Sequence, residues 1–227
     1  MTALPPSGGA RLAGCPDVDP GVTPGMARHG LVRLVVLYMS SRRMSVAMAA
    51  VVALAGGLRI AAIWHWDTYG ALQLPLVAET ACATVVAAAT VSPFGGEERA
   101  SGHWLPMLRL AAALGLTTCA VIALAAAGAG AHLSGGFLDM TRNVAGIAGL
   151  ALVGATALGG GLAWAGPVGY LVVAAYSLYA QWHGGGPSTP WIWPARPLAD
   201  AGAWLCAGAV FAAGMTLIAV RGARDGT

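Results

Sequence analysis

Long apolar stretches separated by short polar ones dominate the pattern of this chain. Each apolar stretch is a candidate membrane span, because a helix needs about 20 apolar residues to cross the hydrocarbon core. The stretches are continuous rather than alternating, which favours helices over a membrane barrel. We therefore expect an all-α, polytopic membrane protein with six transmembrane helices. The six predicted spans are residues 44–63, 72–91, 110–131, 144–164, 168–180 and 198–220.

Two segments of different character precede the first span. Residues 1–30 are rich in Pro and Gly and show no hydrophobic period, so we expect a disordered cytosolic tail. The next segment, HGLVRLVVLYMSSRR (29–43), has an apolar stretch too short to cross a membrane and three Arg residues. This pattern is typical of a helix lying in the membrane interface. The alternative is that it only extends the first span. Residues 31–227 then form the transmembrane domain.

The most charged connection between two spans is SPFGGEERASGHWLPMLR (92–109). Pro93 and the two glycines after it should end the preceding helix, and a short surface helix is then expected over 97–108. Such a helix, with an acidic start and an apolar face, is suited to dock on another protein, although a simple solvated turn remains the alternative. The residues expected to form the docking surface are Glu97, Glu98, Arg99, His103 and Trp104.

Arg59, near the end of the first predicted span, and Glu79, in the second, are ionisable residues inside apolar stretches. At 1.5 Å of rise per residue, they lie roughly 8 Å and roughly 10 Å below the same membrane surface. An unpaired charge at such a depth costs at least a few kcal/mol, so we expect Arg59 and Glu79 to pair or to face a polar cavity. The pair would either fix two helices together or line a translocation path.

Two features of the C-terminal half concern packing. Ala145 and Gly149 are four residues apart in the fourth span, a spacing that lets a neighbouring backbone come close. The segment QWHGGGPSTPWIWPARP (181–197) combines Gly and Pro with three Trp residues. It is expected to form an aromatic belt at one membrane surface and is a candidate to dip back into the membrane.

The distribution of Arg predicts the orientation. With six spans and a cytosolic N-terminus, nine Arg residues fall on the inner side and three on the outer half, as the positive-inside rule requires. Both termini and the 92–109 loop are then cytosolic, and the Trp-rich segment is external. The inner residues are Arg11, Arg28, Arg33, Arg42, Arg43, Arg99, Arg109, Arg221 and Arg224, and the outer ones are Arg59, Arg142 and Arg196.

Composition strengthens the membrane assignment and excludes some chemistry. Hydrophobic residues make up 57% of the chain and charged residues 9%, with a mean hydropathy of +0.70. All twelve basic residues are Arg, so a phosphate-binding loop that needs Lys is excluded, and any ATP on which the protein depends must bind to a partner. The small net charge of +3 gives no case for nucleic-acid binding.

Residue patterns for catalysis or metal binding are also missing from the sequence. The four Cys residues are scattered, without a Cys-x-x-Cys pair, and fit small buried apolar positions. Every His falls in a tail or a loop, and the spans carry no pair of groups suited to acid–base or nucleophilic catalysis. We therefore expect a non-enzymatic chain that holds no cofactor or metal of its own.

Taken together, these features resemble one family: the permease subunits of bacterial type-2 ABC exporters, especially small actinobacterial ones. The shared features are the basic segment LVRLVVLYMSSRR before the first span, six spans with both ends inside, the charged loop between spans two and three, and a broken apolar region before span six. RNVAGIAGLALVGATALGG and PWIWP also look like segments common in such proteins. The resemblance covers residues 31–224.

The resemblance implies a transport subunit in a bacterial cell membrane, moving an unidentified small or amphipathic molecule outward. It implies that the loop with Glu97 and Glu98 seats in a cleft of a separate ABC-type ATPase, which binds ATP and Mg. It also implies a second membrane subunit, identical or different, in a dimer. The alternatives are a non-transporting assembly or immunity protein, or a membrane-embedded enzyme. The extracellular loops are short, which departs from family members with a large outer domain.

Overall fold

The computed structural model describes residues 44–64, 68–90, 104–129, 136–184 and 189–221. The predicted tail and interfacial helix, which end at residue 43, lie outside the described residues. The described part is helical, with no strand among these residues. The long helices are α2 (Met44–Ala62), α3 (Thr68–Thr90), α4 (Trp104–Gly128), α5 (Phe137–Ala157), α6 (Ala165–Trp182) and α7 (Ala201–Arg221), with short 3-10 turns η2 (Gly160–Leu162) and η3 (Trp193–Ala195).

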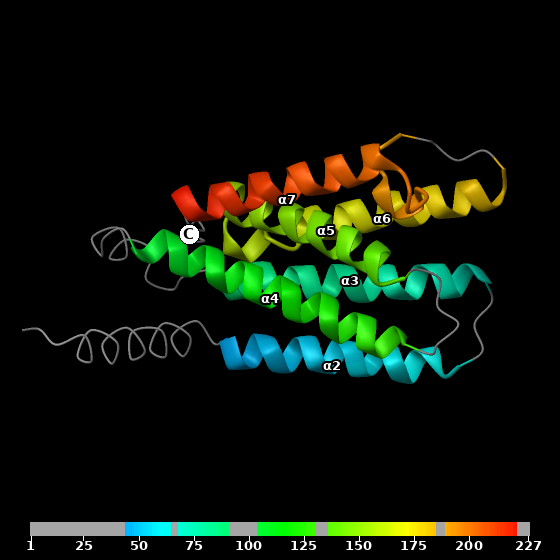
Figure 1. Cartoon of the computed structure of the whole chain (residues 1–227), viewed down its shortest axis with the longest axis horizontal. Helices are drawn as coiled ribbons and strands as arrows, with labels where there is room; N and C mark the ends of the chain where they lie inside the picture. Colours follow the sequence, from blue (N-terminus) through cyan, green and yellow to red (C-terminus); the bar gives the residue numbers. More distant parts are fainter. Residues whose placement is uncertain (1–43, 65–67, 91–103, 130–135, 185–188, 222–227) are drawn as a thin grey trace, which may run out of the picture. The chain divides into compact units, whose positions relative to one another are not determined.

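Successive long helices run in opposite directions along one bundle (Figure 1). The starts of α3, α5 and α7 therefore lie at the same end as the ends of α2, α4 and α6. We call this the Trp-loop end, because residues 189–200, which lead into α7 and include Trp191 and Trp193, lie there. The opposite end carries the turn between α5 and α6.

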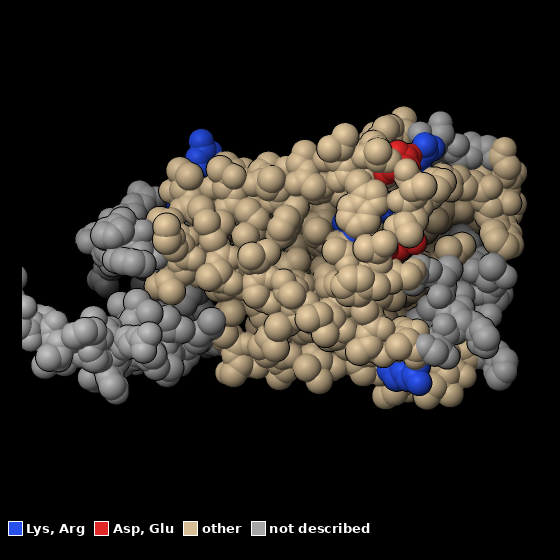
Figure 2. Space-filling view, viewed as in Figure 1, with Lys and Arg blue, Asp and Glu red and all other residues tan. Residues whose placement is uncertain are grey.

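Five segments of the described chain are long and apolar enough to cross a membrane, which confirms an all-α membrane protein. They are Met44–Ala62, Leu72–Thr90, Pro106–Gly128, Gly160–Trp182 and Ala201–Arg221. The remaining long helix, α5, is not among them, so the predicted number of six is approximate. Figure 2 shows a largely uncharged face over the helices, with the visible charged atoms mainly toward the Trp-loop end.

The structure moves the boundaries of two predicted spans. The fourth, predicted at 144–164, is the helix α5 over Phe137–Ala157, and the fifth, predicted to be short, is the 18-residue helix α6. Gly159 causes the shift, because its φ of 90° ends the helical path after α5 and η2 follows directly. The polar residues 137–143, expected in a loop, instead form the first two turns of α5.

The start of α4 corrects another prediction. A separate surface helix was expected over 97–108, but the described chain from Trp104 onward belongs to the same helix as the third span. Pro106 does not interrupt it, because the first turn of a helix has no internal acceptor for the missing N–H. Residues 97–103 lie outside the described part.

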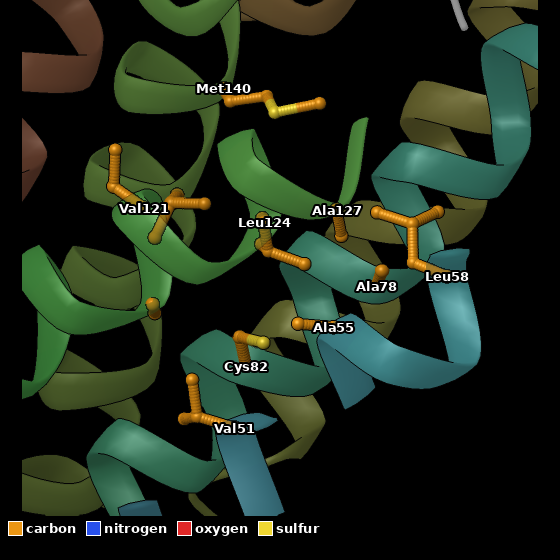
Figure 3. Close-up of a cluster of buried hydrophobic side chains, with 11 residues drawn as sticks. Val51, Ala55, Leu58, Ala78, Cys82, Val121, Leu124, Ala127 and Met140 are labelled. Atoms are coloured by element: carbon orange, nitrogen blue, oxygen red, sulfur yellow. The ribbon is translucent and has the colours of Figure 1, made fainter. Parts of the chain in front are cut away.

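The core consists of small apolar side chains between closely spaced helices. One cluster joins α2, α3 and α4 and includes Val51, Cys82 and Leu124 (Figure 3). Cys82 is fully buried there, as expected for a small apolar residue. A second cluster packs Ile147 of α5 against α3, α6 and α7.

The closest approach of two helices lies between α5 and α7. A Cβ at Gly149 would lie 2.6 Å from the Cα of Phe211, and a Cβ at Gly214 would lie 2.6 Å from the carbonyl oxygen of Gly149. Only glycine fits at either position. The predicted role of Gly149 in close packing is confirmed.

Candidate functional site

A cavity of about 590 Å³ opens among α3, α5, α6 and the loop that precedes α7. Each helix lines the cavity with one of its faces. On α3 this face consists of residues spaced three or four apart: Leu72, Pro75, Leu76 and Glu79. It lies at the Trp-loop end of the bundle, where α3 and α5 begin and α6 ends. The polar and aromatic lining residues are Glu79, Asp139, Asn143, Gln181, Trp182 and Arg196.

Glu79 is the most deeply placed acidic group of this cavity. It is only 2% exposed, although it lies in an otherwise apolar stretch of α3. The side chain of Asn143 hydrogen-bonds to it from α5. Among the residues that the structure describes, its second carboxylate oxygen, Oε2, has no hydrogen-bond partner, and neither does Oδ1 of Asn143. The cavity wall therefore carries buried acceptor oxygens that lack a donor.

Arg142 lies beside the cavity and holds the loop before α7 against α5. Its guanidinium is 1% exposed and donates to the carbonyl oxygens of Arg196 and Pro197, at 3.2 Å each. Its Nη2 also lies 3.0 Å from Oδ1 of Asp139, one turn earlier in α5. Asp139 Oδ1 lacks an aligned hydrogen bond, so this contact is an ion pair without hydrogen-bond geometry. Arg142 was expected in the connection before the fourth span, and the structure corrects this by placing it inside α5.

Arg196 and Asp200 form a second charged contact at the cavity rim. Nε of Arg196 donates to Oδ2 of Asp200, while Oδ1 of Asp200 accepts the backbone N–H groups of Gly202 (2.9 Å) and Ala203 (3.2 Å). Asp200 thus caps the start of α7. The hydrogen bond from Arg196, then the cap from Ala203, hold the pKa of Asp200 below its usual range. This carboxylate is consequently charged and already paired.

The loop between α6 and α7 returns among the helices through Trp193, which is 2% exposed. Its ring stacks on Tyr170 with centroids 4.5 Å apart. The hydroxyl of Tyr170 donates to the carbonyl oxygen of Trp191, at 3.0 Å. A Cβ at Gly146 would lie 2.6 Å from the Trp193 ring, so the indole lies directly on the backbone of α5. Within the segment proposed to dip back, Ile192 and Trp193 therefore pack inside the bundle, whereas Trp191 is 48% exposed.

The structure does not bring Arg59 and Glu79 together as a pair. Nη1 of Arg59 donates to the carbonyl oxygens of Ala129 (2.8 Å) and Ala127 (3.4 Å), at the end of α4. The negative end of that helix attracts the cation, which explains the preference. Glu79 faces the cavity and Asn143 instead. The predicted pair is thus replaced by two separate arrangements.

The predicted docking surface lies almost wholly outside the described residues. Glu97, Glu98, Arg99 and His103 belong to the undescribed connection, and Trp104 is the first residue of α4, with its side chain not described.

Sequence reasoning missed the polar group on α5. Asp139, Arg142 and Asn143 stand at positions i, i+3 and i+4, which puts them on one helical face. This spacing directly before an apolar stretch was the available signal.

Compared with known proteins, the chain matches no family model, no curated protein and no solved structure.

Proposed function

We propose that this chain is the transmembrane subunit of an ATP-driven exporter, moving a small or amphipathic molecule out of a bacterial cell. The observation that carries the proposal is the polar cavity around Glu79. A buried acidic group in a membrane segment is costly, and such groups commonly mark substrate or ion pathways. A bundle needed only as an anchor or scaffold has no use for it.

The energy source is assigned to a second chain. Because this chain has no Lys, it lacks the residue that a nucleotide-binding phosphate loop requires. The resemblance to type-2 ABC permeases implies that the partner is an ATPase, with a cleft that receives the loop containing Glu98 and Trp104. One such chain would be half of the transporter, so the proposal includes a second membrane subunit. The Trp-loop end, with the cavity, then faces outward by the Arg count.

The proposal is tested by capture of the ATPase. The tagged chain is purified from its host after crosslinking, and the recovered proteins are identified by mass spectrometry. We expect an ATPase with a phosphate-binding loop and a membrane assembly that contains two permease-sized chains. Recovery of only a lone 22.7 kDa chain after crosslinking, at full membrane yield, would contradict the proposal.

The docking loop is tested with a double variant, Glu98→Arg with Trp104→Ala. We expect normal membrane yield but loss of the captured ATPase, because the variant reverses a charge and removes an interface anchor. Trp64→Ala is the control, since Trp64 is exposed and follows the end of α2, at the Trp-loop end of the bundle. ATPase capture by the double variant at the control level would exclude this loop as the coupling element.

A further inference from the structure

Two acceptor oxygens on the cavity lining lack a hydrogen-bond donor. Oε2 of Glu79 and Oδ1 of Asn143 are both buried without a partner among the described residues. Oδ1 of Asp139 has only the misaligned contact with Arg142. Leaving a buried polar atom unpaired costs about 1–3 kcal/mol, and more when it is charged. The two unpaired oxygens of Glu79 and Asn143, on the lining of one cavity, indicate that a ligand supplies the missing donors.

The charges around the cavity leave one carboxylate without a cation. Arg142 contacts Asp139 and the loop carbonyls, and Arg196 contacts Asp200. Within the described part of the chain, Glu79 has no ion pair of its own. A cationic ligand would neutralise it, whereas an anionic ligand would add a second negative charge in a region of low dielectric constant.

The rest of the cavity wall is apolar and aromatic. Leu72, Leu76 and Leu178 line it, with Trp182 at its side. An indole face attracts a cation, and the leucines suit an alkyl or aryl group. The volume of about 590 Å³ falls in the range of small-molecule pockets and is far larger than a bare metal ion needs.

We propose that this cavity binds a small organic cation, an alkyl- or arylalkylammonium ion, with Glu79 as the counter-ion and Asn143 as a further acceptor. The ammonium group donates its N–H groups to Oε2 of Glu79 and Oδ1 of Asn143, and the apolar part lies against the leucines. The assignment of this cation as the exported cargo rests on the proposed function, whereas the binding site itself does not.

The test compares three probes of matched size on the purified full-length chain in a maltoside detergent. They are 3-phenylpropylammonium, 3-phenylpropan-1-ol and 3-phenylpropanoate, and their dissociation constants are measured by titration calorimetry. We expect the ammonium ion to bind at least tenfold more tightly than the alcohol, and the carboxylate to bind most weakly. Equal binding of all three probes, or tighter binding of the carboxylate, would overturn the proposal.

Variants then test whether the bound ammonium group lies at Glu79. Glu79→Gln keeps the shape and removes the charge, so the affinity for the ammonium ion should fall to that for the alcohol. The matched control is Thr84→Val on the same helix, whose hydroxyl bonds the carbonyl oxygen of Thr80 and does not line the cavity. It should bind all probes as the wild type does. A preference for the ammonium ion that persists in Glu79→Gln would refute the assignment.

A second variant covers the case in which Glu79→Gln does not fold. Leu178→Trp fills the cavity from α6 and leaves the carboxylate in place, so it should weaken both the ammonium ion and the alcohol more than tenfold. Undiminished binding by this variant would show that the probes do not enter the cavity, which refutes the site.

The ammonium group could belong to a soluble amine or to a lipid headgroup, and the probe distinguishes them. In nanodiscs of phosphatidylglycerol, added phosphatidylethanolamine that displaces the probe supports the site and identifies a lipid headgroup as its source. Absence of displacement supports a soluble amine. Because ATPase capture is a separate measurement, the two proposals can fail independently. Probe binding with no ATPase captured supports the cation site and refutes the exporter. Capture of an ATPase with no probe binding supports the exporter and refutes the cation site.

Discussion

Arg142 is the most deeply buried charged residue in the described part of the chain. It joins α5 to the loop before α7 through two carbonyl contacts and an ion pair, and its guanidinium is almost fully buried. Removing one partner from a buried charged contact leaves the other uncompensated. Asp139 would lose its ion-pair partner, and two carbonyl groups would lose their hydrogen-bond donor.

We therefore expect Arg142→Leu to lower the free energy of unfolding by about 3 kcal/mol or more. Unfolding is followed by circular dichroism during denaturation of the protein in mixed micelles. Arg59→Leu is the matched control, because Arg59 also donates to backbone carbonyls but is exposed. Its loss should be below about 1 kcal/mol. Equal losses for the two variants would show that burial does not set the strength of these contacts.

The cap of α7 predicts a dependence of stability on pH. The pKa of Asp200 is held low by Arg196 and by the backbone of α7, so the folded state favours the ionised carboxylate. Its stabilising contribution is complete above the pKa of the unfolded state, about 4. It is lost as the pH falls through the lower pKa of the folded state.

Asp200→Asn should accordingly be less stable than the wild type at neutral pH, and the difference should shrink as the pH falls below about 4. Asn still caps the helix but cannot pair with Arg196, which isolates the charge. The measurement is the midpoint of thermal unfolding from neutral pH downward for both proteins. A difference that stays constant over this range would contradict the assignment.

Residues inside predicted spans were located from sequence, but their partners were not. The depth of Arg59 and Glu79 follows from counting along two helices. Which groups they meet depends on helices further along the chain: α4 presents its terminal carbonyl groups to Arg59, and α5 presents Asn143 to Glu79. A sequence pattern within α2 and α3 holds no information about those contacts.

At the scale of helices, the contact between α5 and α7 depends on two glycines. Gly149 and Gly214 let the two backbones meet without an intervening side chain. A methyl group at Gly149 would clash with the backbone of Phe211, which cannot rotate away as a side chain could.

Gly149→Ala should thus destabilise the protein by about 1–3 kcal/mol, the usual cost of overpacking. Gly208→Ala on α7 is the matched control, because nothing lies within 4 Å of its Cβ position. That variant should be neutral or more stable, by up to about 1 kcal/mol, since Ala favours a helix. Both are measured by the same unfolding titration. If Gly149→Ala is as stable as Gly208→Ala, the close crossing is wrong.

The apolar stretches predicted most helices because long continuous stretches admit few other structures in a membrane. The prediction failed at α5, where Asp139, Arg142 and Asn143 interrupt the apolar pattern and were assigned to a loop. Their partners compensate for the cost of burial: Arg142 donates to the carbonyl groups of the loop before α7, and Asn143 bonds Glu79 of α3. Such partners are visible only in the packed bundle. The end of α5 was missed because one glycine among many, Gly159, takes a positive φ.

At the scale of the whole molecule, the Arg count predicts that the Trp-loop end faces outward. In a variant without Cys, Thr189→Cys should react with a membrane-impermeant maleimide in intact cells, because residue 189 lies in the exposed loop after α6. Gly161→Cys, in the exposed turn at the other end, should react only after the membrane is permeabilised. The reverse pattern of labelling would invert the orientation and place the cavity on the cytosolic side.

The central position of α5 has a consequence for how the chain is made. A ribosome delivers α5 to the insertion machinery before α6 and α7 exist, yet α5 is the long helix that does not qualify as a span by its own hydropathy. The helix that covers Gly149, and the carbonyls that receive Arg142, are synthesised last. We therefore expect α5 to insert less readily by itself than the other long helices, and to be held beside α3 until the C-terminal helix arrives.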